Sequence, residues 1–242
     1  MIATAPQPKS SWSRLDDSDW LENGAHFSAS EFLRRYEKLP EDEKAELVNG
    51  VVYMAPPVRF EQHAEPDSLI QTWLGVYGIA TPGVKSGTNS TIRLGPDDVP
   101  QPDGLLRIIP ERGGRSRVDA RGYIEGPPEL LVEVAASSAS LDTREKRASY
   151  RRAGVREYLV WRTLDAEIDW WMLEEDEYRP VPLDADGIMR SQVFPGLWLA
   201  KDALLAGDGQ RLLAVLNEGL RHADHSAFTA ELARRQSDGP TA

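Results

Sequence analysis

A glutamate stands inside one of the most apolar stretches of this chain. Glu133 lies in the run ELLVEVAA, residues 129–136, which has the pattern of a strand covered on both faces. An unpaired carboxylate moved into an apolar interior costs several kcal/mol, so it is retained where it is paired, protonated or bound to a metal ion. Two interpretations stay open here: a functional carboxylate, or one half of a buried salt bridge to a nearby arginine.

Asp103 could act together with Glu133. It lies in VPQPDGLLRII, just before an apolar strand and about thirty residues ahead of Glu133. The alternative is that Pro102, Asp103 and Gly104 simply form a turn, because these residue types favour turns.

Lys146 is the third candidate. It lies on a helix expected from Thr143 to about Ala153, and positions 146, 150 and 153 fall on one face of that helix. Tyr150 and Ala153 are the residues best suited to meet a sheet, so Lys146 is predicted to turn toward the core. A lysine placed there could stabilise developing negative charge, and its protonation state stays open because burial and nearby carboxylates act in opposite directions.

Other polar residues also admit two interpretations. Arg144, Arg147 and Arg151 form a stripe along the same helix, which is either a solvated basic face or a surface that holds phosphates. His63, a lone histidine before a helix, is of a kind more often found as a surface or capping residue, and His222 and His225 are given no catalytic role. No Gly-rich phosphate loop, G-x-S-x-G motif or Cys/His metal cluster is present in the sequence.

The elements that must position these residues follow from local patterns. Ser28 with Glu31 predicts a capped helix start, and Asn49-Gly50 between two β-rich arms predicts a hairpin. Apolar residues at helical spacing after Pro66 predict an amphipathic helix. Asp142 is expected to cap the helix that carries Lys146, with Glu145 three residues on, and Gly154 to end it.

Strands account for most of the remaining core. One short strand is expected in TNSTIRLG and another from about Leu105 to Ile109, with a flexible loop at 112–118. ELLVEVAA, the helix after it and VREYLVW form a βαβ-like unit, followed by strands in EIDWWML and EYRPVPL. The core is therefore predicted to be α/β. SQVFPGLWLAKDALLAG is expected to form a turn and a short helix, with two more helices after it.

Composition sets the remaining limits. The chain has 242 residues, no cysteine and a formal charge of −11, which opposes indiscriminate binding to a polyanion. No signal peptide and no apolar run of about 20 residues is present, so a cytoplasmic protein with no membrane partner is expected. We expect a poorly ordered segment at 1–26, one main domain at 27–200 and a helical C-terminal extension at 201–242.

The ordered set PQPD…PELLVEVAASS…LDTREKRASYRRAGVREYLVW resembles the PD-(D/E)XK nuclease superfamily and, more closely, the bacterial Uma family of restriction endonuclease-like proteins. The likeness spans about residues 28–200 and includes ELVNGVVYMAPP followed by His63. Because His63 matches a histidine common in the family, the resemblance implies a role for it as a proton shuttle. The resemblance implies a restriction endonuclease-like core, in which a central mixed β-sheet is flanked by helices and preceded by an N-terminal β-hairpin.

The same resemblance implies a divalent-metal site. Asp103 and Glu133 would bind Mg²⁺ or Mn²⁺, and Glu46 would be an auxiliary acid. The lysine that the superfamily places two positions after the glutamate falls at Ala135, and Lys146 matches the position to which it has moved in the family. A second departure is Arg162, which stands where the family often has an aspartate.

The function expected on this basis is metal-dependent endonuclease activity on the phosphodiester bonds of DNA. The alternative is a catalytically inactive nuclease-fold protein that acts as an interaction module through its tryptophans, Trp161, Trp170, Trp171 and Trp198. By analogy with other nucleases of this fold, a homodimer would let two sites reach two strands.

Overall fold

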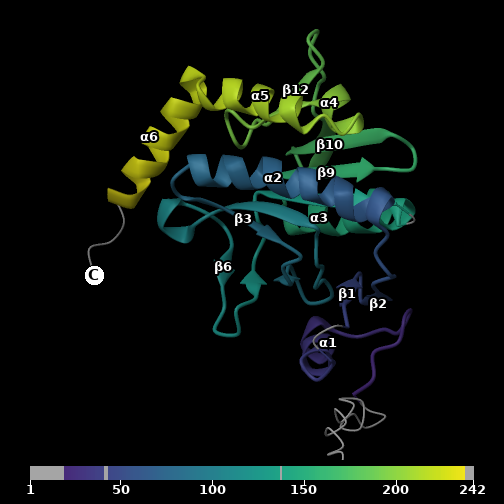
Figure 1. Ribbon diagram of the computed structural model, residues 1–242. Coiled ribbons are helices and arrows are strands. Elements are labelled where there is room, and N and C mark those ends of the chain that lie inside the picture. The colour runs from purple at the N-terminus through teal and green to yellow at the C-terminus, as the bar shows by residue number, and fades with distance from the viewer. Residues whose placement is uncertain (1–18, 41–42, 137, 238–242) are drawn as a thin grey trace, which may run out of the picture.

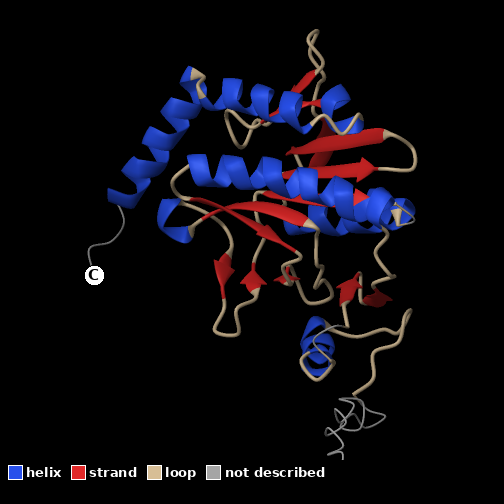
Figure 2. Ribbon diagram, in the orientation of Figure 1, coloured by secondary structure: helices blue, strands red, loops and turns tan. Residues whose placement is uncertain are grey.

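A six-stranded mixed sheet forms the centre of the protein (Figures 1 and 2). The computed structural model describes residues 19–40, 43–136 and 138–237. The strand order is β11-β10-β9-β8-β5-β3. In chain order these strands are β3 (Val84–Thr88), β5 (Gly104–Ile108), β8 (Leu130–Ala135), β9 (Glu157–Arg162), β10 (Glu167–Glu174) and β11 (Glu177–Pro180). Only β8 and β9 pair in parallel among these neighbours, as expected for the two strands of a βαβ unit.

Strand β8 is buried along its whole length, as its apolar sequence predicts. Leu130, Val132 and Val134 face one hydrophobic cluster, whereas Leu131 and Ala135 face another. The alternation expected from the sequence is confirmed, and it places Glu133 on the face of Leu131 and Ala135.

Helices cover both faces of the sheet (Figure 2). Helix α2 (Glu65–Ala80) buries Trp73 and Tyr77 in the cluster that contains Leu130. On the other face, the π-helical turn η4 (Leu141–Lys146) continues into α3 (Arg147–Ala153), which ends at Gly154 with a left-handed φ of 77°. The predicted C-terminal stop at Gly154 is therefore confirmed.

An N-terminal unit precedes the sheet (Figure 1). Helix α1 (Ala29–Tyr36) begins after Ser28, whose hydroxyl accepts a hydrogen bond from the Glu31 N–H, as predicted. Strands β1 (Ala45–Val48) and β2 (Val51–Met54) form the predicted hairpin, and both of its turn residues have positive φ. Of the segment 1–26, residues 1–18 lie outside the described residues, and within 19–26 the Leu21 side chain is buried in this unit.

A small three-stranded sheet follows the N-terminal unit and α2. It consists of β4 (Ile92–Arg93), β6 (Arg117–Val118) and β7 (Ile124–Glu125). The segment 112–118, expected to be a flexible loop, instead holds the end of the 3₁₀ turn η3 (Pro110–Arg112) and strand β6. Ser116 helps to hold this segment in place, because the buried Arg107 donates hydrogen bonds to the Ser116 hydroxyl and carbonyl.

The C-terminal part is helical apart from one hairpin, β12 (Ile188–Arg190) with β13 (Trp198–Ala200). The sequence predicted a turn here rather than a strand. Helix α4 (Lys201–Leu205) and the two expected helices, α5 (Gly209–Leu220) and α6 (Ala223–Ser237), follow. Among the described residues, no helix is both long and apolar enough to cross a membrane.

Candidate active site

Two neighbouring strands bring Asp103 and Glu133 together. Asp103 directly precedes β5, and Gly104 at the start of β5 lies opposite Val132 of β8. Asp103 Oδ2 accepts a hydrogen bond of 2.7 Å from the backbone N–H of Val134, the residue after Glu133. This bond ties Asp103 to the strand that carries Glu133, so Asp103 is more than a turn former.

Lys146 reaches the same place from the helix that follows β8. Its Nζ lies 3.1 Å from Glu133 Oε1, 2.9 Å from Glu46 Oε1 and 3.4 Å from Asp142 Oδ1. The lysine side chain is buried, so it faces the core as the helical spacing predicts. The buried salt-bridge partner of Glu133 is therefore a lysine, and the interpretation that paired Glu133 with an arginine is wrong.

Glu46 comes from β1 of the N-terminal hairpin. Its second oxygen, Oε2, accepts a hydrogen bond from the Gln101 N–H at 3.3 Å. The carboxylate thus bridges the segment that leads to Asp103 and the ammonium of Lys146.

The structure adds two residues to this cluster that sequence reasoning missed. Asp142, expected to cap the helix, lies inside η4 with its side chain buried beside Lys146, and Ser140 holds the N-cap position. The capping prediction is wrong because the helix begins before Asp142. The Tyr150 hydroxyl donates a hydrogen bond of 2.8 Å to Glu133 Oε1. Its place on the inward face of the helix was visible in the sequence, but its contact with Glu133 was not.

His63 lies at the edge of the cluster. It belongs to the π-helical turn η2 (Phe60–Ala64) just before α2, and its Nε2 is 3.3 Å from Asp103 Oδ1. Its Nδ1 is buried and has no hydrogen-bond partner within the described part of the chain. The hydrogen bond that the His63 ring donates to the Asp103 carboxylate raises the pKa of His63 against the opposing effect of burial. His63 is therefore not an ordinary surface residue.

Two effects set the pKa values in the cluster: burial of its side chains and the positive charge of Lys146. Burial raises the pKa of Glu133 well above its usual value, and the charge of Lys146 opposes that rise. Burial by itself would lower the pKa of Lys146, but the carboxylates around it, with Glu133 the largest contributor, raise it well above its usual value. Lys146 consequently stays positively charged.

Two arginines of the stripe on the helical segment, and Arg162, form contacts outside the cluster around Lys146. Arg147 lies over the Trp171 ring at 4.6 Å, and Arg151 pairs with Glu177 at 2.7 Å. Arg162, which replaces the aspartate common in the resembling family, pairs with Asp169 at 2.7 Å. Most of the stripe therefore stabilises neighbouring side chains.

Comparison with known proteins identifies the family and supports the fold. A family model named Uma2 and described as "Putative restriction endonuclease" matches residues 29–202. The chain belongs to the Uma2 family. No curated protein matches it. Among solved structures, a "putative nuclease" from Anabaena variabilis superposes with a TM-score of 0.56 at 14% identity, covering 75% of this chain and 98% of that protein. That likeness concerns the fold, and it agrees with the expected restriction endonuclease-like architecture.

The tryptophans of this Uma2 chain do not form the binding surface that the interaction-module alternative required. Trp161, Trp170 and Trp171 are buried in the two clusters on either face of the sheet. Trp198 is half-buried, with the Arg190 guanidinium 4.4 Å above its ring. The structure thus removes the feature that supported that alternative.

The donor set suits a small, hard cation. In the described ranges, no three His, Asp or Glu side chains close around a point as a ready metal cage. Mg²⁺ seldom needs one, since it keeps several waters and binds through one or two carboxylates together with substrate phosphates. Asp103 Oδ1 makes no hydrogen bond to a backbone group and lies 3.3 Å from His63 Nε2, and Glu133 Oε2 accepts no hydrogen bond within the described residues. These two oxygens fit that role.

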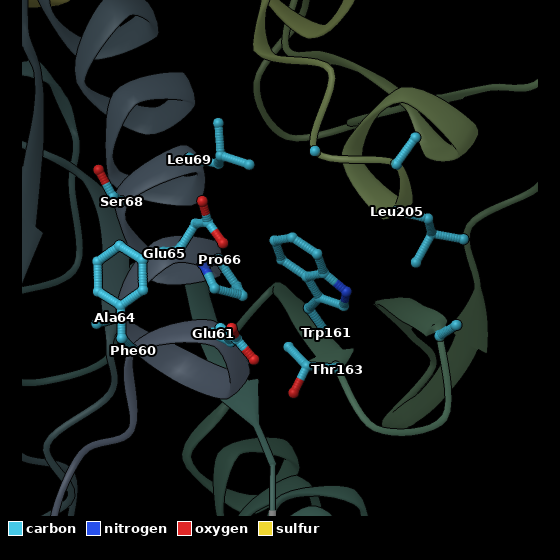
Figure 3. A pocket seen from close by; sticks show the side chains of 13 residues that line it. Phe60, Glu61, Ala64, Glu65, Pro66, Ser68, Leu69, Trp161, Thr163 and Leu205 are labelled. Carbon is cyan, nitrogen blue, oxygen red and sulfur yellow. The ribbon is translucent and has the colours of Figure 1, made fainter.

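A cavity of about 690 Å³ lies next to η2, between the start of α2 and α4 (Figure 3). Phe60, Glu61 and Ala64 line it, whereas His63 does not, so η2 presents different residues to the cavity and to Asp103. Glu61 and Glu65 give this cavity two carboxylates, which disfavour a phosphate.

Proposed function

We propose that this Uma2 chain is a metal-dependent endonuclease that hydrolyses phosphodiester bonds of DNA. The observation that carries the proposal is the convergence of Asp103, Glu133 and Lys146, from three different elements, into one cluster. Membership of the Uma2 family, described as "Putative restriction endonuclease", supports the same proposal.

Asp103 Oδ1 and Glu133 Oε2 would hold Mg²⁺ or Mn²⁺. The bound cation lowers the pKa of a coordinated water and neutralises charge that develops on the phosphate. Asp103 is oriented for this role by the Val134 N–H on its other oxygen, and its backbone carbonyl accepts a hydrogen bond of 2.7 Å from Gln71. A ligand oriented in this way needs little rearrangement when it binds the ion.

Lys146 supplies a fixed positive charge beside the reacting phosphate. Glu46, Glu133 and Asp142 keep its ammonium charged and restrict its position. Such a preorganised charge stabilises a transition state better than a mobile one. Glu46, expected to be an auxiliary acid, would act by positioning Lys146.

His63 is suited to give a proton to the leaving oxygen. Its Nε2 lies 3.3 Å from Asp103 Oδ1, which places a titratable imidazole beside the proposed cation site. The overall charge of −11 opposes binding of DNA at a distance, so we expect affinity to depend on the cation and on local contacts.

Calorimetry with Mg²⁺ and Mn²⁺ and cleavage of supercoiled plasmid test this proposal. Wild type should bind a divalent cation and nick or linearise the plasmid, and Asp103→Asn should lose both activities. Asp186→Asn, in an exposed turn, is the matched control and should keep both. A wild type that binds neither cation, or an Asp103→Asn variant that binds as well as wild type, would overturn the proposal and favour the inactive interaction module.

We also predict a homodimer. A restriction-type double-strand cut needs two sites that reach two strands, and two copies of the chain would supply them. Analytical ultracentrifugation with and without Mn²⁺ and a short duplex measures it directly. A monomer under all of these conditions would contradict the prediction while leaving single-strand nicking intact.

A further inference from the structure

Two hydrogen-bond donors converge on one oxygen of Glu133. The Tyr150 hydroxyl donates to Oε1 at 2.8 Å, and Lys146 Nζ donates to the same Oε1 at 3.1 Å. Both donors come from the helical segment after β8, one turn apart. Within the described chain no hydrogen bond reaches Oε2, so the two oxygens of this carboxylate have different surroundings.

Tyr150 is held firmly in this position. Its side chain is buried, and its ring packs edge-on against Tyr158 with centroids 4.8 Å apart and planes at 87°. Burial among other aromatic rings restricts rotation of the Tyr150 ring, so its hydroxyl cannot turn away from Glu133 without disturbing the cluster that packs α3 on the sheet. The donor is therefore a fixed part of the site.

A carboxylate held in this way can offer only one oxygen to a cation. Oε1 already accepts two hydrogen bonds, one of them from a charged ammonium, and a cation that used both oxygens would have to displace these donors. From this geometry we propose that Tyr150 is a positioning residue that limits Glu133 to one-oxygen binding and thereby selects small octahedral cations over Ca²⁺. This inference rests on the proposed metal-dependent function and adds cation selectivity to it.

The chemistry of the cations explains the direction of the selectivity. Mg²⁺ and Mn²⁺ bind single carboxylate oxygens in near-octahedral geometry, whereas Ca²⁺ takes six to eight oxygens and often uses both oxygens of one carboxylate. A Glu133 with one oxygen occupied by donors disfavours the second arrangement. Freeing Oε1 from Tyr150 should therefore help Ca²⁺ more than it helps Mn²⁺.

Tyr150→Phe tests the inference because it removes the hydroxyl and keeps the ring. Dissociation constants for Mn²⁺ and for Ca²⁺ are measured by calorimetry without DNA, so the readout does not depend on cleavage. We expect the preference for Mn²⁺ over Ca²⁺ to fall by about ten- to a hundredfold, the change that one hydrogen bond to a charged group supplies.

Tyr178→Phe is the matched control. The Tyr178 hydroxyl is also buried and donates a hydrogen bond, at 3.0 Å, to a backbone carbonyl, that of Val155. Tyr178→Phe removes a comparable buried hydrogen bond but should leave the preference for Mn²⁺ over Ca²⁺ unchanged. An unchanged preference in Tyr150→Phe, or an equal change in both variants, would overturn the role of Tyr150 and leave the proposed nuclease function standing.

Wild type alone gives a second test that does not depend on a variant that folds. It should bind Mn²⁺ more tightly than Ca²⁺, and equal or tighter binding of Ca²⁺ would refute the selectivity. A wild type that binds neither cation would overturn the proposed function as well, so the two failures are distinguishable.

Discussion

Lys146 Nζ lies 2.9 Å from Glu46 Oε1, although Glu46 belongs to the N-terminal hairpin and Lys146 to the helical segment packed on the central sheet. The same ammonium contacts Glu133 of β8 and Asp142 of η4. The buried ammonium of Lys146 thus balances the negative charge of carboxylates from three parts of the chain. It joins the hairpin to the sheet at the place where chemistry is expected.

Lys146→Met should abolish cleavage and also destabilise the fold. Removing one partner from a buried ion pair leaves the other charge uncompensated, which costs about 3–5 kcal/mol. We expect the free energy of unfolding, measured by urea denaturation, to fall by about that amount. Part of the loss should disappear at acid pH, because burial already raises the pKa values of Glu133 and Glu46 and their protonation removes the uncompensated charge.

Lys85→Met is the control for this change. Lys85 is an exposed residue of the edge strand β3, so its replacement should alter the unfolding free energy by less than about 0.5 kcal/mol. Equal effects of the two substitutions would show that Lys146 does not balance the buried carboxylates.

His63→Gln should reveal a stabilising contact that weakens as the pH rises. Because the folded-state pKa of His63 is raised above 6.5, its pairing with Asp103 contributes fully below pH 6.5 and is lost as the pH rises through the folded-state pKa. We expect the stability difference between wild type and the variant, at most about 1 kcal/mol, to be largest at low pH. His26→Gln, at an exposed histidine, should show no such trend, and a difference that grows with pH would contradict the pairing.

Gly104→Ala should impair the site more than the fold. A Cβ at Gly104 would lie 2.7 Å from Leu74 Cδ1 and 3.2 Å from Gln71 Nε2, so β5 or α2 must move next to Asp103. We expect cleavage to fall at least about tenfold, because small displacements of a positioned group are costly for catalysis. The control Gly75→Ala adds a Cβ that meets open space in helix α2, and it should stabilise the protein by up to about 1 kcal/mol. Full activity in Gly104→Ala would show that the close approach of α2 does not fix Asp103.

The sequence predicted those parts of the fold that local chemistry determines. Asn49-Gly50 indicated the hairpin because both turn residues need positive φ, and they have values of 53° and 75°. The apolar run around Glu133 indicated a strand covered on both faces. Lys146 was placed inward by helical spacing alone, and this orientation is confirmed.

Features that depend on distant contacts were missed. Asp142 has the residue type of an N-cap, but the helical segment begins before it, and its side chain is buried at Lys146, whose ammonium the distant Glu46 and Glu133 also contact. Strand β3 escaped notice because it is an edge strand whose residues Lys85 and Ser86 are exposed and polar. Likewise, β13 is specified by its pairing with β12 rather than by its own pattern. In each case a tertiary contact outweighed local propensity.

His225, given no catalytic role, should make the attachment of α6 sensitive to acid. The ring is buried: Nδ1 donates to the Leu220 carbonyl at 3.0 Å, and Nε2 is 2.9 Å from the Thr81 hydroxyl, which leaves Nε2 as the acceptor of a neutral imidazole. Burial lowers the pKa of His225 below 6.5. Its contribution to stability is therefore full above pH 6.5 and is lost as the pH falls from there through the lower folded-state pKa.

We expect hydrogen exchange in α6 to accelerate between pH 6.5 and pH 5 after correction for the intrinsic pH dependence of exchange. Exchange in β8, which lies in the centre of the sheet, should change far less. His225→Gln removes the titrating group and should make exchange in α6 independent of pH over this range. The control His26→Gln, at an exposed histidine of the N-terminal unit, should behave like wild type. If α6 in wild type keeps the same corrected exchange rates down to pH 5, His225 does not control its attachment.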